Sequence, residues 1–183
     1  VGSMLRMQQR ALADDEAVRA LREAADRLGL MAKIQRRLHD PAAQHLAFRL
    51  FLQEICTDIV DASGSSDSTT CTVTGDDLLL HSDQATPVAL IAAEVAANAL
   101  EHAFHGVREK RIAVDIRQQN DRILLSIEDN GTGVPEGFDL SQVRSLGLTV
   151  AYRLAQQLGG TLTVSNEPGA RFLLSFPFRP EEA

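Results

Sequence analysis

The sequence predicts an α+β protein in which a helical hairpin precedes a domain built from helices and an antiparallel sheet. Apolar residues recur every three or four positions over residues 16–38, which is typical of an amphipathic helix. Further helical patterns cover residues 43–61, 87–104 and 147–158. Apolar residues alternate over residues 111–117 and 122–128, and two similar runs close the chain. Alternation with a period of two indicates strands that bury one face, so helices and strands share one fold.

Composition describes an ordinary globular chain and disfavours several classes of function. The chain has 183 residues, of which 44% are hydrophobic and 23% charged, enough for one core and a small appendage. Its net charge of -7 argues against a nucleic-acid partner, which requires a basic surface. No apolar run approaches the roughly 20 residues of a membrane span, so we expect no direct membrane contact. No signal peptide is visible. Cys56 and Cys71 lack metal-ligand spacing, and we expect free thiols in the cytoplasm.

The first 42 residues predict part of a helical hairpin that dimerises. Residues 4–12 have the pattern of a helix tail, and a longer amphipathic helix follows over residues 16–38. Two antiparallel helices with one apolar stripe each bury little surface alone, so we expect two copies to pair as a bundle. Pro41 interrupts the helical pattern. A second domain is therefore expected over residues 43–183, after the hairpin of residues 1–42.

The second domain opens with the helix of residues 43–61, and its later elements follow from local signals. The strings CTVT and DLLLH, separated by Gly-Asp, predict a β-hairpin over residues 71–81. Thr86 and Pro87 predict an N-cap followed by proline at the first position of a helix, which extends to Phe104. The last helix is expected to end at Gly159-Gly160, because glycine commonly terminates helices.

Four polar side chains interrupt an otherwise apolar helix pattern, PVALIAAEVAANALEHAF, over residues 87–104. Glu94, Asn98 and either Glu101 or His102 are spaced three or four residues apart, which places them on one helix face. An asparagine among apolar neighbours needs hydrogen-bond partners, because burying an unpaired amide is costly. A single solvated stripe is the competing interpretation.

Two glycine-containing loops complete the pattern. EDNGTG, over residues 128–133, follows a strand-like run and reads either as a simple turn or as a ligand wall. Gly131 and Gly133 would allow close approach of a ligand, and Asp129 could accept a hydrogen bond from an exocyclic amine. Gly147 in SLGL opens a helix, and helix N-termini bind phosphate through free amides.

The order of these motifs, continued by GGTL and the final strand RFLLSFP, resembles the Bergerat ATP-binding domain of the GHKL superfamily over residues 46–178. The resemblance implies a two-layer α/β sandwich whose mixed, mostly antiparallel sheet carries helices on one face. It implies that Asn98 binds Mg²⁺, that Glu94 is a base or orienting group, and that Asp129 reads adenine. It further implies ATP contacts from Asn98, His102, Asp129, Gly131, Gly133, Ser145, Leu146, Gly147 and Leu148.

NALEHAF, SLGL and GGTL further resemble the HWE-type and related bacterial sensor histidine kinases, whose lid is as short as the segment between Gly133 and Leu146. The hairpin then resembles the end of their dimerisation and phosphotransfer domain. The resemblance implies an ATP- and Mg²⁺-dependent kinase of a two-component system. Such a kinase moves the γ-phosphate to a histidine and then to an aspartate of a response-regulator receiver domain.

The phosphoacceptor histidine has two candidate positions. LHDPAAQHL resembles an H box in which His39 takes the phosphate and Asp40 is the base. However, His39 precedes Asn98 by too few residues for an acceptor helix, its partner helix and a hairpin, at about 1.5 Å of rise per helical residue. Pro41 also falls where the acceptor helix would have to continue. We therefore expect the acceptor to lie upstream of residue 1.

Three positions depart from the family pattern and keep other functions open. Glu101 stands where a basic residue usually touches the phosphates, Ala170 where a threonine usually supports the adenine-reading aspartate, and Ser145 where a glycine is usual. A carboxylate near a triphosphate repels it unless Mg²⁺ intervenes. The alternatives are a histidine phosphotransfer or phosphatase protein with a degenerate ATP site, and an anti-sigma-factor serine kinase of the same superfamily.

Overall fold

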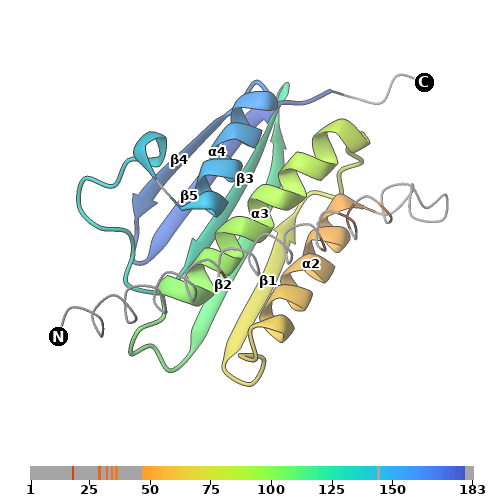
Figure 1. The fold of residues 1–183 in the computed structure, drawn as a ribbon. Coiled ribbons are helices and arrows are strands. Elements are labelled where there is room, and N and C mark those ends of the chain that lie inside the picture. The colour runs from red at the N-terminus through yellow and green to blue at the C-terminus, as the bar shows by residue number, and fades with distance from the viewer. Residues whose placement is uncertain are drawn as a thin grey trace.

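The computed structural model describes residues 47–143 and 145–179, together with Val18, Gly29, Ala32, Ile34 and Arg36. The predicted α+β class is confirmed, because a five-stranded sheet carries the helices α2, α3 and α4 on one face (Figure 1). Apart from the five isolated positions, which are helical, the hairpin predicted over residues 1–42 lies outside the described residues, as does His39. The division at residue 43 therefore stays a prediction.

The elements follow one another along the chain in a simple order. They are α2 (Phe48–Ala62), β1 (Thr69–Gly75), α3 (Ser82–His102), β2 (Lys110–Gln119), β3 (Arg122–Asp129), the 3₁₀ turn η1 (Leu140–Gln142), α4 (Leu146–Gln157), β4 (Thr161–Asn166) and β5 (Ala170–Pro177). In space the strands lie in the order β1-β2-β3-β5-β4. Only β1 and β2 run parallel, so the sheet is mixed and mostly antiparallel as predicted.

The core lies between the sheet and its three helices. In β3 and β5 every second side chain is buried, among them Ile123, Leu125, Phe172 and Leu174. This is the pattern expected of strands covered on one face. Helix α3 packs between α2 and α4 and is buried continuously from Gln84 to Val95. Its central place explains why its sequence is almost uniformly apolar or alanine.

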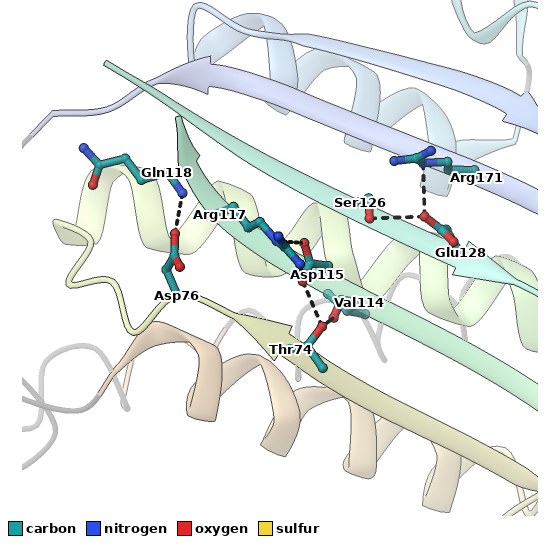
Figure 2. Close-up of polar contacts among 9 residues, drawn as sticks. All are labelled: Thr74, Asp76, Val114, Asp115, Arg117, Gln118, Ser126, Glu128 and Arg171. Carbon is teal, nitrogen blue, oxygen red and sulfur yellow. Dashed lines mark hydrogen bonds and ion pairs between the residues drawn. The ribbon is translucent and has the colours of Figure 1, made fainter. Parts of the chain in front are cut away.

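The opposite face of the sheet is polar (Figure 2). Arg117 Nε lies 2.7 Å from Asp115 Oδ2, and Arg171 Nε lies 3.1 Å from Glu128 Oε1. Partial burial acts to raise the pKa of Asp115, but hydrogen bonds from Arg117 and Thr74 outweigh it and lower the pKa overall. Such exposed ion pairs contribute little to stability. The polar side chains instead make this face of the sheet compatible with contact with water.

The β-hairpin predicted over residues 71–81 is wrong. β1 pairs with β2 in parallel, in a register that joins Cys71 to Ile112, and the following segment forms no strand. Gly75 has a φ of 113°, and its position leaves no room for a side chain beside the carbonyl oxygen of Ile116. The Gly-Asp pair therefore ends β1 and does not turn the chain into a second strand of a hairpin. Only glycine tolerates both the positive φ and the close approach to Ile116 O.

The N-cap predicted at Thr86 is also wrong, since α3 begins five residues earlier, after His81. The reason is the Gln84 side chain, which is only 1% exposed. Its amide donates to Pro177 O (2.7 Å) and accepts from Arg179 N (3.0 Å), which ties the first helical turn to the end of β5. Pro87 therefore lies inside the helix, where its loss of one backbone hydrogen bond is outweighed by tertiary contacts.

Gln53 on α2 covers the free edge of β1. Its side-chain amide donates to Cys71 O (3.1 Å) and accepts from Val73 N (2.9 Å). The amide thus repeats the pair of bonds that a neighbouring strand would make. Exposed strand edges invite pairing with other chains, so Gln53 both holds α2 to the sheet and satisfies its edge.

Cys56 and Cys71 meet between α2 and β1, which their sequence spacing did not predict. Both thiols are free. The hydrogen bond to Cys71 and burial raise the pKa of Cys56 far above its usual range, whereas the hydrogen bond from Cys56 lowers the pKa of Cys71. Cys71 is also the less buried of the two, so we expect it to be the thiol that ionises first.

Replacing Gln53 with leucine should lower the free energy of unfolding by about 1–3 kcal/mol, because two strand-edge groups would lose their partners inside the α2–β1 interface. Urea unfolding followed by circular dichroism measures this loss. Gln157→Leu, at an exposed position on α4, is the control and should change stability by less than about 0.5 kcal/mol. Equal effects of the two variants would contradict the role given to Gln53.

Alkylation of the native chain at pH 8 should modify Cys71 before Cys56, because the thiolate is the reactive form and Cys56 is buried. Peptide mapping by mass spectrometry after short exposure to iodoacetamide measures the two rates. In urea the two rates should become similar. Faster labelling of Cys56 in the native chain would show that the pair is assigned the wrong way round.

Candidate nucleotide-binding site

Helix α3 leaves the core at its C-terminal end and carries Glu94 and Asn98 at that point. Glu94 is buried, Asn98 is partly buried, and the Glu101 and His102 side chains are each 61% exposed. The continuous burial before Glu94 rules out a solvated stripe along the whole helix. Exposure therefore increases along the predicted face: Glu94 and Asn98 lie at the core boundary, whereas Glu101 and His102 reach the surface.

Glu101 and His102 form a loose surface pair, with Glu101 Oε2 and His102 Nε2 3.8 Å apart. The unusual carboxylate of Glu101 is thus exposed, and its charge is screened by water and salt. Within the described residues, no group of three or more His, Cys, Asp or Glu side chains could hold a metal ion.

Asp129 ends β3 and is only 8% exposed. Its Oδ1 atom accepts hydrogen bonds from Gly131 N (2.8 Å) and Ala170 N (3.2 Å). Among the described residues no hydrogen bond reaches Oδ2, which is left to accept one from a ligand. The backbone amide of Ala170 supports Asp129 here, so this contact does not need the hydroxyl that threonine would supply.

Gly169 makes that contact possible. A Cβ atom at residue 169 would lie 2.1 Å from Asp129 O and 2.5 Å from Asp129 Oδ1, closer than atoms can approach. The turn between β4 and β5 can touch the end of β3 only because residue 169 has no side chain. Sequence reasoning missed Gly169, and its signal was the position in NEPGA directly before the last strand.

The EDNGTG loop is held on two further sides. Asn130 Nδ2 donates to Glu109 O (2.8 Å), and Asn130 Oδ1 accepts from Arg111 N (2.7 Å). Thr132 N donates to Ala103 O (2.9 Å), and a Cβ at Gly131 would lie 2.3 Å from the same oxygen. The loop is therefore packed against the end of α3, which also carries Asn98. A turn that merely reverses the chain would not need this contact.

The segment after Gly133, here called the lid (residues 134–143 and 145), folds between β3 and α4. Leu140 is buried and Phe138 is partly buried against the core. Asp139 accepts hydrogen bonds from Ser141 and Gln142, and the bond from the Ser141 side chain is the main reason that the pKa of Asp139 lies below its usual value. Phe138 thus packs on the protein in this structure.

The lid ends at the N-terminus of α4, where four predicted site residues lie in sequence. Ser145 is the N-cap, although its side chain makes no capping bond, and Leu146 is 52% exposed. Gly147 and Leu148 are buried. Leu148 belongs to the hydrophobic core, whereas Ser145 and Leu146 remain accessible. Free amides at this helix start suit an anion.

The structure thus brings the predicted residues to one end of the molecule in two groups. Asp129, Gly131 and the end of α3 are in direct contact, and Gly133 leads from them into the lid. The second group, Ser145 to Leu148, lies at the N-terminus of α4, where the lid ends. Three supporting residues were missed by sequence reasoning: Asn130, Gly169, and Asn166, whose side-chain amide bonds both Val134 N and Val134 O. Asparagine and glycine in turns are common, so only their long-range contacts reveal them.

Two family models match the chain. The model described as "Histidine kinase-, DNA gyrase B-, and HSP90-like ATPase" matches residues 83–180, and one described as "Histidine kinase" matches residues 1–63. The second match extends through α2. Within the described residues, no helix is long and apolar enough to cross a membrane.

Curated relatives agree with these matches. Sensor histidine kinase PdtaS of Mycobacterium tuberculosis is 28% identical over 185 residues, which cover 97% of this chain and 36% of the relative. UhpB of Salmonella typhimurium, a signal transduction histidine-protein kinase/phosphatase, is 33% identical over 104 residues, or 57% of this chain and 19% of the relative. The chain thus spans about a third of the length of the first relatives it matches.

Solved structures share the fold. The histidine kinase domain of a blue-light-activated histidine kinase from Erythrobacter litoralis superposes with a TM-score of 0.73 and 22% identity, over 84% of this chain and 74% of that one. The family-model matches and the curated relatives confirm the resemblance to bacterial sensor histidine kinases that the sequence predicted. The chain belongs to the family of histidine kinase-, DNA gyrase B- and HSP90-like ATPases.

Proposed function

We propose that this chain is the ATP-binding and dimerising part of a sensor histidine kinase. It binds Mg-ATP and transfers the γ-phosphate to a histidine, from which an aspartate of a response regulator receives it. The observation that carries the proposal is Asp129, a buried carboxylate with one oxygen fixed by two backbone amides and the other left for a ligand. A fixed acceptor of this kind selects an exocyclic amine such as that of adenine.

The remaining roles follow from position. Asn98 would hold Mg²⁺ through its side-chain oxygen, and Glu94, one helical turn earlier, would orient water or assist proton transfer. The residues fit this ion, because Mg²⁺ commonly takes one or two protein oxygens and completes its shell with phosphates and water. When bound, Mg²⁺ neutralises phosphate charge. Amides at Ser145–Leu148, with His102 across the site, would face the phosphates under the lid.

The partners follow from the family. Two copies would pair through the hairpin of residues 1–42, and a receiver domain would approach the phosphorylated histidine. We favour an acceptor upstream of residue 1, with His39 as the alternative. A cytoplasmic location suits a response-regulator partner and the free thiols.

Two other functions have less support. An anti-sigma-factor serine kinase does not account for the histidine kinase match over residues 1–63. A phosphotransfer protein with a degenerate ATP site would gain support from weak binding caused by Glu101 or Ala170. Ala170 nevertheless supports Asp129 through its backbone, and Glu101 is exposed.

Asp129→Asn should weaken ATP binding at least about tenfold, which corresponds to about 1.4 kcal/mol. The substitution places an amide donor where an acceptor is required, or turns the acceptor away from the ligand. Isothermal titration calorimetry with ATP and Mg²⁺ compares the native chain with the variant, and Ser165→Ala, at an exposed position on β4, is the control. A native chain that binds no ATP would sink the kinase proposal and favour the phosphotransfer function.

Gly169→Ala should lower both stability and ATP affinity, because the added Cβ pushes the β4–β5 turn away from Asp129. We expect a loss of about 1–3 kcal/mol in unfolding free energy, the usual cost of forcing atoms into a packed site. Gly64→Ala is the control: Gly64 has a φ of 67° and open space around it, so it should lose stability but keep its ATP affinity. Urea unfolding and calorimetry measure the two effects. Unchanged ATP affinity in Gly169→Ala would mean that the Ala170 amide does not position Asp129.

A further inference from the structure

Asn166, the last residue of β4, is bonded twice to the first residue of the lid. Its Oδ1 atom accepts from Val134 N and its Nδ2 atom donates to Val134 O, each at 2.8 Å. The side-chain amide thus pairs with one backbone residue as a neighbouring strand would. The two residues are 32 positions apart, so the contact is tertiary and does not arise from a local turn.

Gly133 completes this junction from the other side. Its φ is 76°, and a Cβ at this position would lie 2.6 Å from Asn166 Oδ1. Residue 133 must therefore be glycine both for its backbone angle and for the space that Asn166 occupies. The chain turns sharply at Gly133, and Asn166 fixes the direction in which it leaves.

The far end of the lid has a different anchor. The Thr149 hydroxyl shares its one hydrogen between Val143 O (3.0 Å) and Ser145 O (2.8 Å), which holds that end against α4. Leu140 is buried between the two ends. Asn166 is exposed, so water competes for its bonds with Val134. Exposed hydrogen bonds open at lower free energy than more buried ones, so we expect the bonds to Val134 to open more readily than the partly buried bond from Thr149 to Val143 O.

We propose that Asn166 is a positioning residue that latches the first residue of the lid and thereby slows the release of bound nucleotide. This inference rests on the proposed ATP site, since the lid borders that site. The latch would open and close without unfolding the sheet, because the backbone pairing of Asn166 with Ala170 does not involve its side chain. Loss of the side-chain bonds should then affect dissociation more than association.

The test measures the dissociation rate of a fluorescent ATP analogue by stopped flow, together with hydrogen exchange of the Val134 amide without nucleotide. Asn166→Ala should release the analogue about five to ten times faster, the effect expected for one or two modest hydrogen bonds, and its Val134 amide should exchange faster. Asn166→Asp keeps the acceptor but loses the donor, so it should fall between. Ser165→Ala, the exposed neighbour on β4, should match the native chain in both measurements.

The outcomes separate the latch from the proposed function. A native chain that binds the analogue, with an unchanged dissociation rate in Asn166→Ala, overturns the latch and leaves the ATP site standing. A native chain that binds no analogue overturns the proposed function and this inference with it. If Asn166→Ala lowered both the association rate and the thermal stability, Asn166 would have only a structural role. That result would also overturn the inference.

Discussion

The carboxylate of Asp129 is the interaction on which the site depends, because it joins the end of β3 to the loop that follows it and to the β4–β5 turn. One oxygen binds the loop after β3 through Gly131 and the β4–β5 turn through Ala170. The same loop rests on the end of α3 through Thr132 and Ala103. A change at any of these contacts therefore moves Asp129 Oδ2, the other carboxylate oxygen. The position of Oδ2 determines from which donor it can accept a hydrogen bond.

Side-chain amides take the place of missing strand partners throughout this domain. Gln53 covers the edge of β1, Gln84 extends the end of β5, Asn130 joins the start of β2, and Asn166 holds the lid. An amide can donate and accept at once, as a peptide group does. Each pair satisfies backbone groups that would otherwise need water, and backbone groups buried without partners are costly. Loops and helices are attached to the sheet by this means.

Much of the fold was predictable, because alternation and helical periodicity report directly on which face is buried. β3 and β5 and the body of α3 followed from those patterns. The partner of β1 could not be predicted in this way, because alternation does not indicate whether the neighbouring strand comes from the next segment of the chain or from a later one. The start of α3 was missed because Thr86-Pro87 is a strong local signal and the competing tie between Gln84 and β5 is tertiary. At the site, motif order predicted Asp129 and Gly131, whereas Asn166 and Gly169 depend on contacts across more than thirty residues.

The position of β5 in the sheet has a consequence for folding during synthesis. β5 follows the other four strands of this sheet in the sequence, yet it lies between β3 and β4 in the interior of the sheet. A nascent chain that still lacks β5 thus has a gap between two strands, with one edge of each exposed and Asp129 without the Ala170 amide. The contacts around Asp129 are therefore complete only after β5 has been synthesised and has entered the sheet. Chains shortened before β5 would expose unpaired strand edges that can pair with other chains.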